Sequence, residues 1–341
     1  MRKIAILLIG LTFTAASCNL LNDPLNTGSK GVYLSQDGGQ SFSPSNAVSG
    51  RGSIDNLTVT SLLFDPFDSV KVYLGSPSGI YKSEDGGKAW QFILTGINVS
   101  DLTADPFQPG VVYASGISGS NGKIIKTLDG GMSWLDIFSE PNKNNAVTAI
   151  SVGLLNRSQL VAGLASGEVI RSSDEGATWE AGEDFNDRIV KIRSVSGNKT
   201  FLLTQRKGLF MSSDQGKTWA DKISDPALAI SLFYDFATPA NSTQNIYLAT
   251  EQGLVRTQDD GSTWDLVNLP ANTAERRVQA VEVNPMNAAN VFANIGSTLF
   301  KSVNNGSTWE TKRLDTGQAV RLIRVNPQTS NVIYLGLGGR I

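Results

Sequence analysis

Histidine is absent from the 341-residue sequence, and cysteine occurs once, at Cys18. Without histidine, the chain has no Ser-His-Asp or Cys-His catalytic site and no histidine-ligated metal. A single cysteine also excludes an intramolecular disulfide and a cysteine-based zinc cluster. The sequence therefore predicts neither a metal nor a cofactor.

Charge is also scarce, because charged residues make up 18% of the chain and the net charge is −2. No basic run or basic face can be read from the order of residues, so we expect no binding to nucleic acid. Glycine, in contrast, occurs 34 times. This composition is typical of a globular protein that is rich in turns.

The single cysteine follows a pattern typical of a secretion signal. Arg2 and Lys3 precede an apolar run over residues 4–13 that is too short to span a membrane. Small residues at positions 15–17 then lead into Cys18, which resembles the lipobox of bacterial lipoproteins, where this thiol is lipidated. The resemblance implies a signal peptide over 1–17, a tether over 18–30, and a lipid anchor at the extracytoplasmic side of the bacterial cell envelope. An ordinary cleaved signal peptide with an incidental cysteine is the alternative.

One motif, Ser/Thr-x-Asp-x-Gly-x-x-Trp, occurs seven times. All six tryptophans of the protein stand at its last position, and Phe42 takes that place in the first copy. Successive copies are 48, 44, 45, 40, 45 and 45 residues apart. The third position is occupied by Asp37, Asp85, Asp129, Asp174, Asp214, Asp259 and Asn304. We expect a structural role for this residue, because its side chain can accept amide hydrogen bonds of its own turn while the aromatic ring packs on the sheet.

Each repeat contains four short segments that are typical of strands, separated by turn residues, which predicts one blade of a β-propeller. The basic residues that precede five of the motifs are expected to face the outside of the ring, namely Lys82, Lys126, Arg171, Arg256 and Lys301. At the chain ends, residues 31–34 with the first motif lack two strands, and residues 320–336 supply two strands without a motif. The sequence thus predicts an all-β, seven-bladed propeller of four-stranded blades over 31–341, with the last blade closed by the N- and C-terminal strands.

The motif resembles the Asp-box, also called the bacterial neuraminidase (BNR) repeat. Proteins with this repeat include sialidases, xyloglucan-cleaving endoglucanases, sortilin-like receptors and the photosystem II stability/assembly factor family. The last family is similar in size and blade number, and its members are exported proteins that bind other proteins without catalysis. The resemblance implies the fold, and it leaves the function open.

Function is expected in the loops on the face opposite the boxes. Basic residues in or beside these loops are candidates for recognising carboxylates or an acidic partner: Arg51, Arg188, Arg206, Lys207, Arg276, Arg277 and Arg313. Scattered solvated charges are the alternative interpretation. We expect a separate pair, Glu282 and Arg324, to join neighbouring inner strands as a structural contact.

Two functions remain open. The first is a non-catalytic, lipid-anchored monomer that acts as a binding or assembly module for a protein or a glycan. The second is a glycoside hydrolase, sialidase-like or endoglucanase-like, with two carboxylates flanking a cleft. The sequence lacks the Arg-Ile-Pro element of sialidases. Candidate carboxylates for a hydrolase are Asp55, Asp101, Glu140, Asp184, Asp187 and Glu275.

Overall fold

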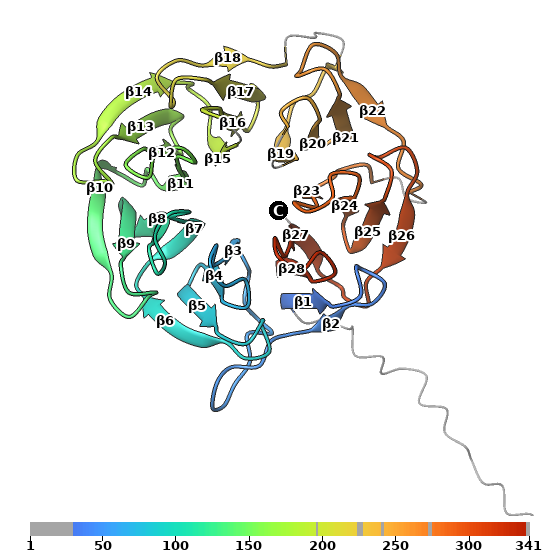
Figure 1. Ribbon diagram of the computed structural model, residues 1–341, viewed down its shortest axis with the longest axis horizontal. Coiled ribbons are helices and arrows are strands. Elements are labelled where there is room, and N and C mark those ends of the chain that lie inside the picture. Colours follow the sequence, from blue (N-terminus) through green and yellow to red (C-terminus); the bar gives the residue numbers. More distant parts are fainter. Residues whose placement is uncertain (1–29, 196, 224–227, 240–241, 272–274, 339–341) are drawn as a thin grey trace, which may run out of the picture.

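Short apolar segments interrupted by glycine, proline and Asp/Asn turns form 28 strands in the described residues of the computed structural model. The structure describes residues 30–338 except 196, 224–227, 240–241 and 272–274. The strands make seven antiparallel sheets of four strands, arranged around a central axis as the blades of a propeller (Figure 1). The predicted fold is confirmed.

Six blades are continuous in sequence. The first contains β3 (Ser61–Phe64), β4 (Val72–Ser76), β5 (Gly79–Ser83) and β6 (Gln91–Thr95). The second contains β7 (Asn98–Ala104), β8 (Val112–Ser118), β9 (Asn121–Thr127) and β10 (Leu135–Lys143). The third contains β11 (Val147–Val152), β12 (Leu160–Leu164), β13 (Glu168–Ser172) and β14 (Glu180–Asp184).

The remaining continuous blades follow the same order. The fourth contains β15 (Ile189–Ser194), β16 (Thr200–Thr204), β17 (Leu209–Ser212) and β18 (Ala220–Asp221). The fifth contains β19 (Phe233–Ala237), β20 (Ile246–Thr250), β21 (Gly253–Thr257) and β22 (Asp265–Val267). The sixth contains β23 (Val281–Val283), β24 (Val291–Ile295), β25 (Thr298–Ser302) and β26 (Glu310–Arg313).

The seventh blade joins the two ends of the chain, as predicted. It contains β27 (Ala319–Val325), β28 (Ile333–Gly338), β1 (Gly31–Ser35) and β2 (Ser43–Pro44). Strand β1 pairs antiparallel with β28 over five residues, from Gly31 opposite Leu337 to Ser35 opposite Ile333. This pairing holds the two ends of the chain together in one sheet and closes the ring.

Each box is a hydrogen-bonded turn between the third and fourth strands of its blade. In the fifth blade, Asp259 Oδ1 accepts from Thr257 Oγ1 at 2.7 Å and from the Thr263 amide at 2.8 Å. The second oxygen, Oδ2, accepts from Thr263 Oγ1 at 2.7 Å. Asn304 of the sixth blade uses its Oδ1 in the same way for Ser302 and Thr308. An amide can therefore replace the carboxylate in this turn.

The box tryptophans connect neighbouring blades. Trp264 of the fifth blade is buried and donates its indole N–H to the Lys222 carbonyl, which follows the fourth blade. Trp179 of the third blade donates to the Ile137 carbonyl in the second. Trp90 of the first blade donates to the Ser45 carbonyl beside β2. In these three blades, the last box residue thus anchors its blade to the preceding one.

The expectation that the basic residues before five of the boxes face outward is wrong. The Lys82 ammonium group lies 3.0 Å from the Gly130 carbonyl in the next box, and the Arg256 guanidinium lies 2.7 Å from the Asn305 carbonyl in the next box. Strand alternation points these side chains out of the plane of their own sheet, and they are long enough to reach the following blade. They therefore form contacts between blades.

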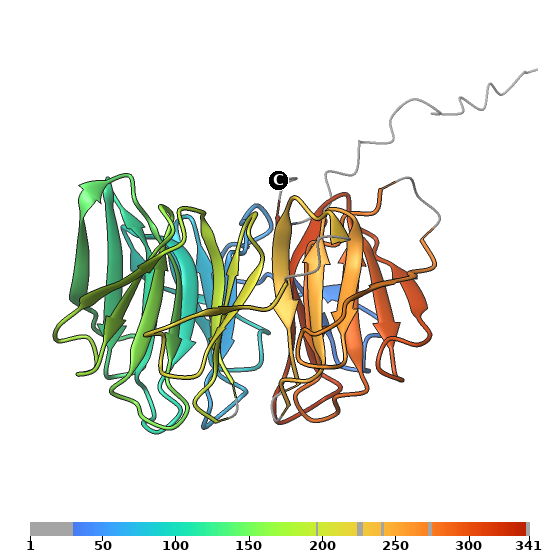
Figure 2. The same ribbon diagram turned by 90° about the horizontal axis from the view of Figure 1, so that it is seen from above.

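The ring has two different faces, and Figure 2 shows it from the side. We call the face at which β1 begins and β28 ends the upper face, because Gly31 and Leu337 are paired there. The opposite face holds the seven boxes and the turns between first and second strands, and we call it the box face. No helix among the described residues is long and apolar enough to cross a membrane.

Candidate functional site

A cavity of about 520 Å³ lies at the mouth of the central channel on the upper face. Its walls come from the starts of the inner strands and from the loops that precede them. Polar side chains dominate the lining, including Asn98, Thr148, Gln205 and Gln279. Among the described residues, the charged side chains of the lining are two arginines and no carboxylate. The cavity is therefore electropositive.

The two arginines are Arg188, directly before β15, and Arg321, within β27. In the described part of the chain, neither guanidinium forms an ion pair, since the salt bridges there involve other basic residues. Burial in the cavity lowers the pKa of both side chains from the ordinary value of arginine, and both stay charged. Two unpaired guanidinium groups in one concave site favour binding of an anion.

The same lining has unused hydrogen-bonding groups. The Oε1 atom of Gln279 and the hydroxyl of Thr60 are buried and have no hydrogen-bond partner among the described residues. Both residues line the cavity. Buried polar atoms without partners are uncommon in folded proteins. A polar ligand that both accepts from the arginines and donates to Gln279 would satisfy them.

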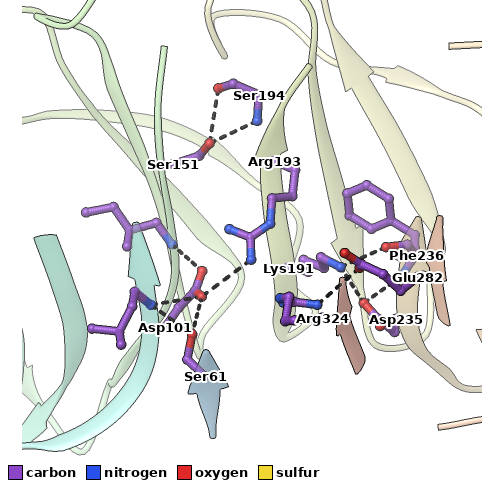
Figure 3. A network of polar contacts seen from close by, with 12 residues as sticks. Ser61, Asp101, Ser151, Lys191, Arg193, Ser194, Asp235, Phe236, Glu282 and Arg324 are labelled. Carbon is purple, nitrogen blue, oxygen red and sulfur yellow. Dashed lines mark hydrogen bonds and ion pairs between the residues drawn. The ribbon is translucent and has the colours of Figure 1, made fainter. Parts of the chain in front are cut away.

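Below the cavity, buried charges cross the central channel (Figure 3). Lys191 of the fourth blade lies 2.6 Å from Asp235 Oδ1 of the fifth, and it donates to the Phe236 carbonyl at 2.7 Å. Arg324 lies 3.4 Å from Glu282, which is the expected contact between the seventh and sixth blades. These pairs occupy the channel between the two mouths, so we treat each mouth as a separate site.

Two aspartates extend this network by binding backbone amides of the next blade. Asp101 accepts from the Ile150 amide of the third blade at 3.3 Å, and Asp235 accepts from the Val281 amide of the sixth at 3.1 Å. Arg193 lies 3.8 Å from Asp101. Asp101 was expected in a rim loop as a candidate acid, and this is wrong: it is buried in β7, where its oxygens are used to join blades.

The predicted arginines do not form one patch. Arg188 lines the cavity, and Arg277 stacks over Tyr234 of the lining at 6.0 Å from the ring centroid. Arg206 and Lys207 follow the lining residue Gln205, and both donate their backbone amides to Asp187. The others lie elsewhere, with Arg276 in a smaller pocket of the fifth blade, Arg313 at the end of β26, and Arg51 in the loop closed by the Ala47–Ser53 bridge.

The remaining predicted carboxylates lie outside the cavity. Asp184 and Glu140 belong to outer strands β14 and β10 and lie near Glu168. Burial raises the pKa of Glu168, and the charges of Glu140 and Asp184 raise it further. Asp55 accepts from Asn46, and Glu275 precedes Arg276 on the upper face. Across the described residues, no group of three or more acidic side chains has the geometry to hold a metal ion.

Sequence reasoning did not identify Arg321. In a regular strand, the side chains of Arg321 and Arg324 would point to opposite sides, and the sequence predicts that Arg324 pairs with Glu282. A β-bulge between Val320 and Leu322 breaks this alternation. As a result Arg321 lines the upper cavity while Arg324 pairs with Glu282 below it. The sequence feature that could have indicated Arg321 is the presence of a second basic residue in the same inner strand as Arg324.

Seven blades, a box in each, and a ring closed by both chain ends define the class of the fold, an Asp-box, or BNR, β-propeller. Within that class, residues 182–338 match the family model described as photosynthesis system II assembly factor YCF48. The solved structure of YCF48 from Cyanidioschyzon merolae superposes with a TM-score of 0.65 at 15% identity, covering 82% of this chain and 95% of that one. Another structure, described as YCF48 bound to D1 peptide, gives a TM-score of 0.65 at 13% identity, covering 83% and 94%.

Xyloglucanases share the fold as well. The GH74 xyloglucanase from Xanthomonas campestris superposes with a TM-score of 0.67 at 17% identity, covering 86% of this chain and 52% of the enzyme. In sequence, the oligoxyloglucan-reducing end-specific xyloglucanase of Emericella nidulans is 28% identical over 127 residues, which is 34% of this chain and 15% of that protein. The chain thus spans about half of the first enzyme and much less of the second. At these identities, the superposed structures show the fold alone.

Proposed function

We propose that the protein is a non-catalytic binding or assembly module that holds an anionic segment of a protein partner in the upper cavity. The observation that carries the proposal is the pair of unpaired arginines, Arg188 and Arg321, in a concave site without a carboxylate. Guanidinium groups bind carboxylates through two parallel hydrogen bonds, and partial desolvation strengthens such bonds. The structural neighbour described as YCF48 bound to D1 peptide supports a peptide as the ligand of a propeller of this kind.

The test is a pull-down from detergent-solubilised membranes with the wild-type protein and an Arg188→Gln/Arg321→Gln variant. We expect the variant to lose the co-purifying partner, because glutamine keeps much of the side-chain length but removes both charges. Arg313→Gln is the matched control, since Arg313 is exposed at the end of β26. Partners retained by the double variant, with an unchanged circular dichroism melt, would contradict the proposal.

A glycoside hydrolase is the second candidate, because the relatives include xyloglucanases and because Glu168 has a raised pKa beside Glu140 and Asp184. A raised carboxyl pKa suits a general acid. Against it, the chain matches only about half of the superposed GH74 enzyme. Hydrolysis of xyloglucan oligosaccharides that is lost in Glu168→Gln would support this candidate. If the wild-type protein releases no sugar from these oligosaccharides, the binding function is favoured.

We also propose that the protein is a lipoprotein of the bacterial cell envelope, anchored at its extracytoplasmic side through Cys18. Residues 1–29 lie outside the described residues, so the support is the lipobox-like sequence before Cys18. The first described residues, Lys30 and Gly31, lie on the upper face beside the last residues of β28. A tether from Cys18 would therefore join the ring on the face that holds the cavity. Cys18→Ala should release the protein from membranes, and unchanged membrane partitioning would contradict the anchor.

A further inference from the structure

The box face carries exposed apolar side chains at one repeated position. In four blades, the turn between the first and second strands presents a large apolar residue three positions after the last residue of the first strand. These are Phe67, Phe107, Leu155 and Met286, exposed by 46%, 49%, 65% and 58%. Each of these turns connects the two innermost strands of its blade, so the four residues lie on the box face near the lower mouth of the channel.

The fold does not require an apolar residue there. The turn needs the backbone N–H of this residue, which donates to the Asp or Asn side chain two positions earlier. The distance is 2.9 Å for Phe67 and 2.7 Å for Phe107. The seventh blade makes the same bond at 2.9 Å with Gln328, a polar residue. The turn therefore holds the exposed side chain in a fixed place while leaving its chemistry free. Rigid apolar groups lose little entropy when they bind.

Apolar exposure is concentrated on this face. Nine of the twelve exposed large hydrophobic side chains of the described residues lie on it, and the other three, Phe92, Leu135 and Leu266, lie in outer strands. The first three blades hold most of them, and we call this group the apolar sector: Phe67, Val70, Phe107, Leu128, Met132, Leu154 and Leu155. Apolar exposure gathered on one face of a protein is typical of an interaction surface.

A cavity of about 240 Å³ adjoins the sector at the lower channel mouth. Leu154 forms one edge of it, and Phe236 and Pro285 lie in its wall. Lys191, Arg193 and Glu282 also line it. The cavity is large enough for one or two side chains of a partner whose remaining surface rests on the sector.

The charges around the sector are acidic. Lys82 pairs with Glu84 and Lys71 with Asp68, and Glu175 is held by Lys126 and Arg157. Of the box carboxylates of this region, Asp129 and Asp174 form no ion pair among the described residues, whereas the charge of Lys88 in the same box acts on Asp85. Hydrogen bonds from Ser133 and Thr178 hold the pKa of Asp129 and Asp174 well below the usual range. The rim therefore stays negative at neutral pH.

We infer that the apolar sector docks a second protein whose contact surface has an apolar centre and a basic rim. The acidic box rim disfavours an anionic bilayer, and the described chain begins on the opposite face, where a lipid anchor would attach. A second copy of this chain would bring two acidic rims together. The site lies on the other face from the arginine cavity, so it is independent of the function proposed above.

The experiment uses two synthetic peptides with the same apolar core of leucine and phenylalanine, one flanked by lysines and the other by glutamates. Binding to the folded protein is measured by fluorescence anisotropy. We expect the lysine-flanked peptide to bind, and Phe107→Ser/Leu155→Ser to weaken it at least about tenfold. Leu266→Ser is the control, because Leu266 is similarly exposed at 55% but lies in outer strand β22. The Arg188→Gln/Arg321→Gln variant should bind the peptide like the wild type.

Several outcomes would overturn the inference. These are binding of neither peptide, equal binding of both, or equal binding by the wild type and the Phe107→Ser/Leu155→Ser variant. Sedimentation velocity that shows a dimer abolished by the same substitutions would assign the sector to a second copy. Flotation with vesicles of phosphatidylglycerol and phosphatidylethanolamine, lost in the same variant, would assign it to a lipid surface.

Discussion

Lys191 lies 2.6 Å from Asp235, and both side chains are only 12% exposed in the channel between the fourth and fifth blades. Burial lowers the pKa of Lys191, and the carboxylate of Asp235 acts in the opposite direction. The Phe236 ring lies 4.9 Å from the ammonium group. The cation is therefore held by one carboxylate, one carbonyl and one aromatic face.

Removing the carboxylate should destabilise the ring. Asp235→Asn leaves a buried cation without its partner, which costs about 3–5 kcal/mol of unfolding free energy. In Lys191→Met/Asp235→Asn the cation is gone, so much of that loss should be recovered. Urea unfolding of the single and double variants gives the coupling energy. A double variant that is less stable than either single variant would show that this pair does not act as a unit.

The box carboxylates make stability depend on pH in acid. Hydrogen bonds from Thr178 and Thr263 lower the pKa of Asp174 and Asp259 to about 2, from 3.8. A carboxyl whose pKa is lower in the folded state stabilises the fold above its unfolded pKa, and that stabilisation is lost as the pH falls towards the folded value. We therefore expect the boxes to lose stability between about pH 4 and pH 2.

Asn304 provides the design for the corresponding variant, since it makes the same turn without a titrating group. Asp174→Asn/Asp259→Asn should unfold near the wild-type urea midpoint at pH 7. Its midpoint should fall less between pH 4 and pH 2, because two carboxyls no longer take up protons on unfolding. Parallel acid profiles of the two proteins would contradict this account.

The tryptophans allow one hydrogen bond to be isolated. Trp264→Phe removes the indole donor to the Lys222 carbonyl, 2.9 Å away. Trp134→Phe removes the same volume, but the Trp134 indole N–H is buried without a partner among the described residues. We expect Trp264→Phe to cost about 1 kcal/mol more than Trp134→Phe. Guanidinium chloride unfolding of both variants measures the difference. Equal losses would indicate that only ring volume matters.

The boxes and the ring closure could be predicted because local turn chemistry and strand count determine them. The side chains that face the channel could not be predicted, because β-bulges interrupt strand alternation in β7, β19 and β27. Asp101 follows one of these bulges and faces the channel instead of a rim loop. Arg321 is the residue at the bulge of β27, and it lines the upper cavity. A bulge depends on pairing with a neighbouring strand, so a single strand sequence does not reveal it.

The lysine and arginine residues directly before the boxes illustrate a second limit of prediction from the sequence. Alternation indicates that Lys82 and Tyr81 lie on opposite faces of β5, but not that a neighbouring blade packs against each face. The Lys82 ammonium group contacts the Gly130 carbonyl, 48 residues further along the chain. Contacts between blades depend on the curvature of the whole ring, and this is decided by blade number and packing.

The closure of the ring is open to a direct test. Strands β27 and β28 supply the inner half of the seventh blade, and β28 pairs with β1 over five residues. A chain that ends at residue 318 leaves β1 and β2 without partners and exposes the buried side chains of Val32 and Tyr33. It should lose the cooperative thermal transition seen by circular dichroism and bind the dye ANS. A chain that ends at residue 338 keeps β28 complete, so it should melt like the full-length protein. If the chain ending at 318 also melted cooperatively at the same temperature, six blades would be sufficient for the fold, and pairing of the two ends would not be what stabilises it.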